Sequence, residues 1–248
     1  MNEPNPPTPP PAPAPSSGSH PLPPIPLAVE PNAGAASLLE ALLKRPAQLV
    51  TAAHLSQSTR MALTLGLAAA ILLLLYGIVV GSFSGGIQLA AAPVKIAIGS
   101  FLSVLICLPS FFIFASLAGA EITLRGAITV LMASLALTAV LLLGFAPVAW
   151  VFSQSTDSVG LISTLHVIFW FISVGFGLRL LRIFMNVARV TDQFHIKVWT
   201  AIFIFVSLQM ITALRPIVGT ANTLLPQEKR FFFHHWVETL SEEPQVRR

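Results

Sequence analysis

The chain has 248 residues, of which 54% are hydrophobic and 10% are charged, and its mean hydropathy is +0.79. Soluble domains carry roughly 25% charged residues, so this composition excludes a soluble globular protein and indicates a multi-pass membrane protein. The net charge of +4 does not imply a nucleic-acid partner, because most Lys and Arg residues flank apolar runs. The single cysteine, Cys107, excludes an intramolecular disulfide framework.

Residues 1–34 hold 13 of the 20 prolines. This segment has almost nothing apolar to bury and few backbone donors, so we expect a disordered, partly polyproline-II tail in the cytoplasm. Two interpretations of the tail stay open: a solvated spacer, or a ligand for a partner that recognises proline-rich segments. No basic region followed by an apolar stretch precedes the first span, which is therefore expected to act as its own insertion signal.

Residues 35–60 are predicted to form an amphipathic juxtamembrane helix. The spacing of Ser37 and Glu40 is that of a capping box, which would open the helix. Leu38, Leu42 and neighbouring leucines fall on one face, and Pro46 disfavours continuation of the helix. We expect this face to lie in the membrane interface and to hold the first span in position.

Five membrane spans are predicted within a transmembrane domain covering residues 61–214. The clearest run is uncharged over the 31 residues between Arg125 and Asp157. About 20 apolar residues cross a hydrocarbon core that is ~30 Å thick. The expected spans are about 61–81, 94–117, 126–150, 160–184 and 198–214. The sequence thus predicts an all-α polytopic membrane helix bundle, followed by an outer amphipathic C-terminal tail at 215–248.

Several residues within or beside these spans are candidates for helix packing or for intramembrane polar contacts. Small residues spaced as GxxxG favour close helix approach, and a proline removes one backbone hydrogen bond. We expect a kink at the second-span proline and a bend or an end at the third-span proline. The candidates are Gly77, Gly81, Pro109, Pro147, His166, Gln209 and Arg215. His166 and Gln209 need hydrogen-bond partners in hydrocarbon, and Arg215 can extend to the headgroups.

Basic residues cluster where the fourth span ends. Arg179, Arg182 and Arg189 are interpreted as topogenic and interfacial residues, with contacts to anionic lipid headgroups as the alternative. Near the spans, eight positive residues fall on the side of the N-terminus and four on the opposite side. This count predicts a cytoplasmic N-terminus and an outer C-terminus. An ion pair between Glu121 and Arg125 is also expected, from their i,i+4 spacing.

No motif in the chain indicates catalysis, so we expect no enzyme, no catalytic residues, no metal and no cofactor. The sequence contains no Walker motif, no GxSxG and no HExxH. His234 and His235 are adjacent, and side chains at neighbouring helical positions diverge by about 100°, so they do not form a metal site by themselves. Ser103 or Ser110 with His166 leaves an intramembrane hydrolase as a third alternative.

The segment ITLRGAITVLMASLALTAVLLLGFAPVAW resembles the central spans of Yip1-type membrane proteins, through Gly144-Phe145-Ala146-Pro147 at its end. The chain more closely resembles bacterial five-span proteins in two places. These are the YGxxxGSF end of the first span, residues 76–83, and the Gln-x4-Leu-Arg-Pro ending of the last, residues 209–216. The resemblance covers about residues 60–220. It implies a multi-pass protein of the bacterial cytoplasmic membrane and implies no particular activity.

Two functions from different classes follow from these observations. The first is a non-enzymatic scaffold, adaptor or subunit of a membrane complex, suggested by a partner-type tail on a bundle that lacks charges at mid-membrane. The alternative is a transporter or flippase-like component for an apolar or lipidic substrate, suggested by the prolines and polar residues at membrane depth. Expected partners are membrane lipids, other membrane-complex subunits or a protein that binds the proline-rich tail.

Overall fold

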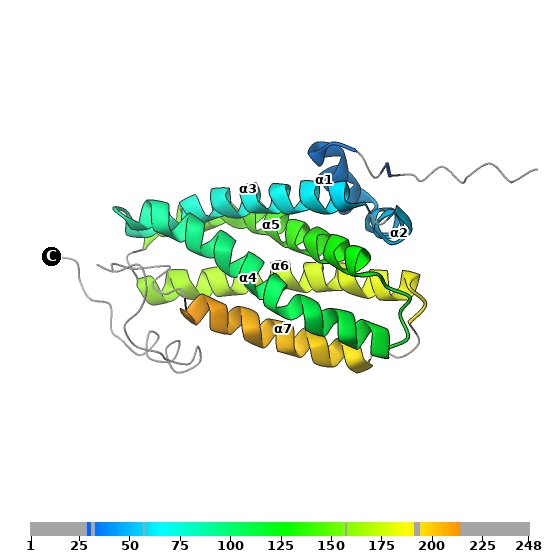
Figure 1. Cartoon of the computed structure of the whole chain (residues 1–248). Coiled ribbons are helices and arrows are strands. Elements are labelled where there is room, and N and C mark those ends of the chain that lie inside the picture. The colour runs from blue at the N-terminus through cyan, green and yellow to red at the C-terminus, as the bar shows by residue number, and fades with distance from the viewer. Residues whose placement is uncertain (1–28, 31–32, 57, 157, 191–193, 214–248) are drawn as a thin grey trace, which may run out of the picture.

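The computed structural model describes residues 29–30, 33–56, 58–156, 158–190 and 194–213. Over these residues the regular structure consists of seven α-helices, which confirms the predicted all-α fold class (Figure 1). Four of the helices, α3 to α6, are long and apolar enough to cross a membrane. The helices are α1 (Ala35–Lys44), α2 (Pro46–Ser56), α3 (Thr59–Ser84), α4 (Gln88–Leu117), α5 (Leu124–Ser155), α6 (Val159–Val187) and α7 (Phe194–Ala213).

The spanning helices are longer than the predicted spans. They contain 26 to 32 residues, which at 1.5 Å per residue gives about 39–48 Å, so their ends extend beyond a ~30 Å hydrocarbon core. The predicted fifth span corresponds to α7, which begins at Phe194 rather than at 198. Its apolar part, Phe194–Met210, is shorter than the four spanning helices.

Prolines do not end the helices that contain them. α4 begins at Gln88 and runs through both Pro93 and Pro109. α5 continues past Pro147 to Ser155, which corrects the expectation that Pro147 could end the third span. A proline removes one hydrogen bond, whereas ending the helix in hydrocarbon would leave several backbone groups unpaired at several kcal/mol each. Continuing the helix past the proline therefore costs less free energy than ending it there.

Helix α5 lies at the centre of the bundle, with α3 on one side and α6 on the other. α4 packs along α3, α7 packs along α4, and α6 comes closer to α5 than to α7 over their described residues (Figure 1). The inner positions of α5 are mostly small, and several are completely buried, including Ala127, Ala133, Ala136 and Ala139. Small side chains let neighbouring backbones approach, which favours association where no hydrophobic effect operates between helices.

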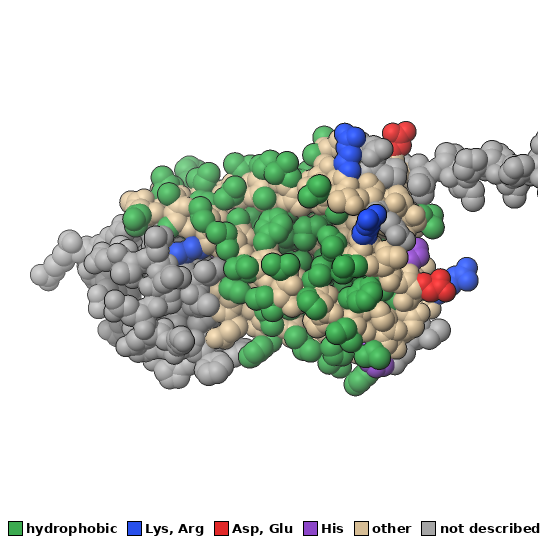
Figure 2. Space-filling view, in the orientation of Figure 1, with side chains coloured by type: hydrophobic (Ala, Val, Ile, Leu, Met, Phe, Trp, Pro, Cys, Tyr) green, Lys and Arg blue, Asp and Glu red, His purple; other side chains and the backbone are tan. Residues whose placement is uncertain are grey.

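The outer surface of the spanning helices is apolar. One stripe of α3 carries exposed Leu63, Leu67, Ile71, Leu74 and Ile78, at helical spacing, and Leu63 is 69% exposed. Figure 2 shows hydrophobic side chains over the middle of the visible face and charged side chains mainly toward its ends. A surface of this kind faces lipid rather than water, so the protein is embedded in a membrane.

The segment before the first span forms two helices, α1 and α2, rather than one. Gly34 is the N-cap of α1 and no side chain caps it, so the predicted capping box at Ser37 is wrong. Pro46 takes the first position of α2, where its missing N–H and fixed φ cost nothing. The two helices lie at the end of the bundle where α3 begins (Figure 1).

The α1–α2 pair is part of the protein core. The sequence had suggested instead that its apolar face lies in the membrane interface. Six of its side chains are fully buried or nearly so: Leu38, Leu42, Leu49, Val50, Ala52 and Ala53. They join the same apolar cluster as the spanning helices, because α1 contacts α3 and α5 while α2 contacts α5 and α6. Each buried leucine contributes roughly 2 kcal/mol where the segment would otherwise meet water.

The charged residues at the end of the bundle that carries α1 and α2 form few ion pairs within the described residues. Glu121 precedes α5, whose N-cap is Thr123, so the predicted i,i+4 helical pair of Glu121 with Arg125 does not form. Within the described residues, the ion pair present joins Lys44 Nζ to Glu40 Oε1 at 2.9 Å. The hydrogen bond and charge of Lys44 hold the pKa of the Glu40 carboxyl below its usual range.

Candidate functional site

Gly77 lies at a close crossing of α3 and α4. A Cβ atom on Gly77 would lie 2.3 Å from Cα of Pro93, so no other residue fits there without moving the backbone. Gly81, one turn further along α3, is buried. Gln209 is half-buried on α7. Arg215, the predicted C-terminal amphipathic tail and the pair His234-His235 lie outside the described residues.

Tyr76 and His166 form a polar pair inside the membrane domain. Tyr76 Oη lies 2.7 Å from His166 Nδ1, and the rings meet edge-on with centroids 5.8 Å apart. Tyr76 comes from α3 and is 4% exposed, while His166 comes from α6. The pair gives each group a partner in a medium that supplies no water. The sequence predicted that His166 needs a partner but did not identify Tyr76.

The region around Pro109 is occupied by a tryptophan from α7. Trp199 Nε1 lies 3.2 Å from both the Cys107 carbonyl oxygen and Ser110 Oγ, and its ring packs against Phe111. Trp199 is 1% exposed, so it fixes α7 to α4 at the predicted kink. Sequence reasoning missed this residue.

The serines considered for hydrolysis are not joined to the histidine. Ser103 Oγ donates to the Gly99 carbonyl at 2.8 Å, and Ser110 Oγ donates to the Cys107 carbonyl at 2.9 Å. His166 instead bonds to Tyr76. The described residues also contain no group of three or more His, Cys, Asp or Glu residues that could hold a metal ion.

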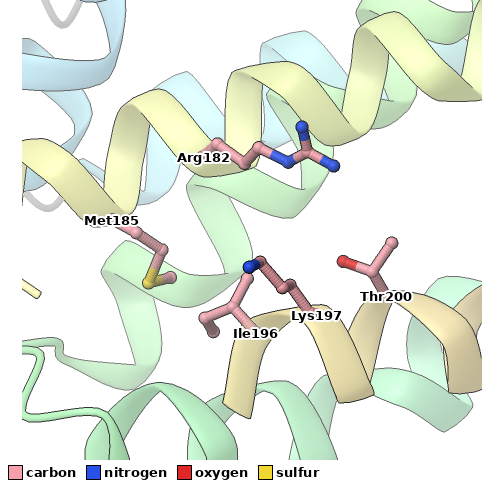
Figure 3. Close-up of a pocket in the computed structure, with 5 residues that line it drawn as sticks. All are labelled: Arg182, Met185, Ile196, Lys197 and Thr200. Carbon is pink, nitrogen blue, oxygen red and sulfur yellow. The ribbon is translucent and has the colours of Figure 1, made fainter. Parts of the chain in front are cut away.

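A pocket with two cationic side chains lies between α6 and α7. Arg182 and Met185 line it from α6, and Ile196, Lys197 and Thr200 line it from α7 (Figure 3). In this view the Lys197 ammonium and the Thr200 hydroxyl lie between the two helices, while the Arg182 side chain extends along α6. Arg179 and Arg189 are exposed but do not line the pocket. The structure thus separates Arg182 from the other two predicted headgroup residues and adds Lys197.

The fold and these residues define a helical, membrane-embedded protein. The α1–α2 pair packs at one end of its bundle, Tyr76 and His166 form a buried polar pair, and Arg182 and Lys197 line a pocket. No protein-family model, no curated protein and no solved structure matches the chain. The resemblance to Yip1-type and bacterial five-span proteins therefore stays a prediction.

Proposed function

We propose that the protein is a non-enzymatic scaffold, adaptor or subunit of a membrane complex, which presents its proline-rich N-terminal segment at one end of a rigid bundle. The observation that carries this proposal is the burial of the α1–α2 pair. Leu38, Leu42 and Leu49 are completely buried in the cluster that also contains the spanning helices. The segment that leads out of the tail is therefore part of the folded body.

The anchoring extends to the end of the proline-rich segment. Val29 is 5% exposed and belongs to the same apolar cluster, and the Ala33 N–H donates to the Glu30 carbonyl at 3.0 Å. A partner that binds residues 1–28 would thus be held at a fixed place beside the membrane. Polyproline-II segments suit this role, because they dock into aromatic grooves with little loss of conformational entropy.

We infer a location in the cytoplasmic membrane of a bacterium from the resemblance to bacterial five-span proteins, and the distribution of charge supports a cytoplasmic location for this end. Of the nine Lys and Arg residues in the described part of the chain, Lys95 alone lies toward the opposite end, near the start of α4. The other eight lie near α1, α2, the α4–α5 turn or the α6–α7 turn. Positive residues beside spans favour the cytoplasmic side.

Cysteine labelling in intact cells tests this orientation. The native Cys107 is buried, so it should react little with the reagent. An impermeant thiol reagent is expected to label Gln154→Cys, which is exposed at the far end of α5, and not Ser17→Cys. The reverse labelling pattern would place the N-terminus outside.

The adaptor proposal is tested by replacing residues 1–28 with a Gly/Ser segment of equal length. This variant keeps a spacer of the same length but removes the polyproline-II ligand, and it leaves Val29 and the α1–α2 pair intact. Purification in mild detergent with mass spectrometry is expected to show loss of the co-purifying proteins and an unchanged melting temperature. An unchanged set of co-purifying proteins would contradict the proposal.

A transporter or flippase-like component for an apolar or lipidic substrate is the second candidate. The observation that favours it is the Tyr76–His166 pair between α3 and α6, which puts a polar contact at membrane depth. If the pair serves transport, His166→Leu should change the distribution of a fluorescent lipid between the two leaflets of proteoliposomes. Equal lipid distribution with the variant and the unmodified protein, at equal folded content, would count against this candidate.

A further inference from the structure

The pocket between α6 and α7 is lined by two cationic side chains, and it lies at the level of the membrane where lipid headgroups are expected. Arg182 lies five residues before the last residue of α6, about 7–8 Å along the axis, and Lys197 is the fourth residue of α7. α6 is about 44 Å long, so about 7 Å at each end lies beyond a centred ~30 Å hydrocarbon core. Both side chains can therefore reach the phosphate level of a bilayer.

The polar groups of the pocket match a phosphate. A guanidinium offers a planar fork of donors, an ammonium offers a compact point charge, and the Thr200 hydroxyl can donate or accept. Among the described residues, neither Arg182 nor Lys197 forms an ion pair with a carboxylate. A bound phosphate would give both cations a charged partner.

The remaining walls match the part of a lipid that lies below the phosphate. Met185 and Ile196 are apolar and 1% and 4% exposed, so they supply the inner surface of the pocket. Acyl chains can lie against exposed apolar side chains of the two helices, such as Phe176 on α6 and Phe205 on α7. A free phosphate would need only the cations, whereas a phospholipid uses both the cations and the apolar surface of the two helices.

We propose that this pocket binds the headgroup phosphate of an anionic phospholipid, held by Arg182, Lys197 and Thr200, with the acyl chains next to α6 and α7. The site is independent of the adaptor role proposed above. It differs from a general attraction of basic residues to the membrane, because Arg179 and Arg189 carry the same charge at the same end but lie outside the pocket.

Native mass spectrometry of the delipidated full chain, titrated with phosphatidylglycerol, tests the proposal. The variant Arg182→Gln with Lys197→Gln is compared with a control, Arg179→Gln with Arg189→Gln, which loses the same charge. We expect the pocket variant to bind phosphatidylglycerol about tenfold more weakly, since it loses charge-assisted hydrogen bonds. The control should change the affinity less than about twofold, as expected for exposed charges.

Further measurements decide between a lipid site and its alternatives. Lys197→Arg keeps the charge and should retain binding, and equal melting temperatures must show that all variants fold. Phosphatidylcholine, whose choline offsets the phosphate charge, should bind equally to both variants. An equal loss of phosphatidylglycerol in pocket and control variants would overturn the proposal in favour of general surface charge. Displacement of the lipid by millimolar inorganic phosphate would overturn it in favour of a free-phosphate site.

Discussion

Helix α6 meets its two neighbours in the chain in opposite ways. Against α5 it is so close that a Cβ atom on Gly177 would lie 2.5 Å from Thr138 Oγ1 and 2.9 Å from the Ser134 carbonyl oxygen. Against α7 its backbone is less close, and cationic and apolar side chains of the two helices line a pocket. The difference follows from side-chain size, because small residues let helices associate in lipid and large or charged ones hold them apart.

This comparison distinguishes a helix contact that is filled by protein from one where we propose that a lipid binds. The α5–α6 contact is filled by protein, and Thr138 Oγ1 reaches the Ser173 carbonyl of α6 at 3.4 Å. α7 is held from its other side, because its Trp199 donates hydrogen bonds to Cys107 and Ser110 of α4. A lipid at the α6–α7 pocket therefore need not disturb the contacts that hold either helix.

The largest expected effect is at the α5–α6 contact. Gly177→Leu would force a side chain into backbone and side-chain atoms of α5, and overpacking of this kind costs about 3 kcal/mol or more. We expect little folded protein by size-exclusion chromatography in detergent. The control is Gly175→Leu on the same helix, where a Cβ atom meets nothing within 4 Å. Normal folding of both variants would show that the close contact does not determine the position of α6.

A smaller effect is expected where α7 is held to α4. Trp199→Phe keeps an aromatic ring against Phe111 but removes the N–H that reaches Cys107 O and Ser110 Oγ. The loss should lower the free energy of unfolding by about 1 kcal/mol, measured by thermal denaturation in detergent. Trp150→Phe, at an exposed position, should leave stability unchanged. If the two variants behave alike, Trp199 does not anchor α7.

The smallest effect is expected at the connection between α6 and α7. α4 and α6 end in the same hydrogen-bonded turn, since Ala120 N donates to Ala115 O and Val190 N donates to Met185 O, each at 3.0 Å. The left-handed position is Gly119 (φ 82°) in α4 but Arg189 (φ 58°) in α6. Glycine at this position would relieve the strain of the left-handed backbone, but it would also raise the conformational entropy of the unfolded chain. The first effect is only slightly larger than the second.

Arg189→Gly should therefore stabilise the protein by about 0.5 kcal/mol, whereas Gly119→Ala should destabilise it by about 1 kcal/mol. Melting temperatures in detergent measure both changes. A destabilising Arg189→Gly would mean that the arginine side chain contributes contacts that outweigh the backbone strain.

The helical membrane fold was predictable because long runs without Asp, Glu, Lys or Arg are typical of helices that span a membrane, where all backbone groups must be hydrogen-bonded within the segment. The helix ends were less predictable. The sequence placed limits at the hydrocarbon core and at prolines, whereas α4 includes Pro93 and α5 continues past Pro147. The burial of Leu38 and Leu42 against protein could not be distinguished from burial in lipid, since both favour the same amphipathic pattern.

The candidate site was predicted only in part. Arg182 was identified from its place beside a span, but its grouping with Lys197 was not. Residue 182 lies five residues before the end of α6 and residue 197 lies three residues after the start of α7, so an antiparallel helix pair puts them within about one turn of the same depth, and this signal was present in the sequence. No comparable signal links Tyr76 to His166 or Trp199 to Cys107, which lie 90 and 92 residues apart in the chain.

The most direct test of the contrast between the two sides of α6 is photo-crosslinking in nanodiscs with phosphatidylglycerol that carries a reactive group next to its headgroup. Tightly packed and open contacts should differ in their access to lipid. We predict that crosslinks concentrate on residues 182–200 and fall in the Arg182→Gln, Lys197→Gln variant. Crosslinks spread evenly over the lipid-facing helices, and unchanged in that variant, would contradict a lipid-binding pocket between α6 and α7.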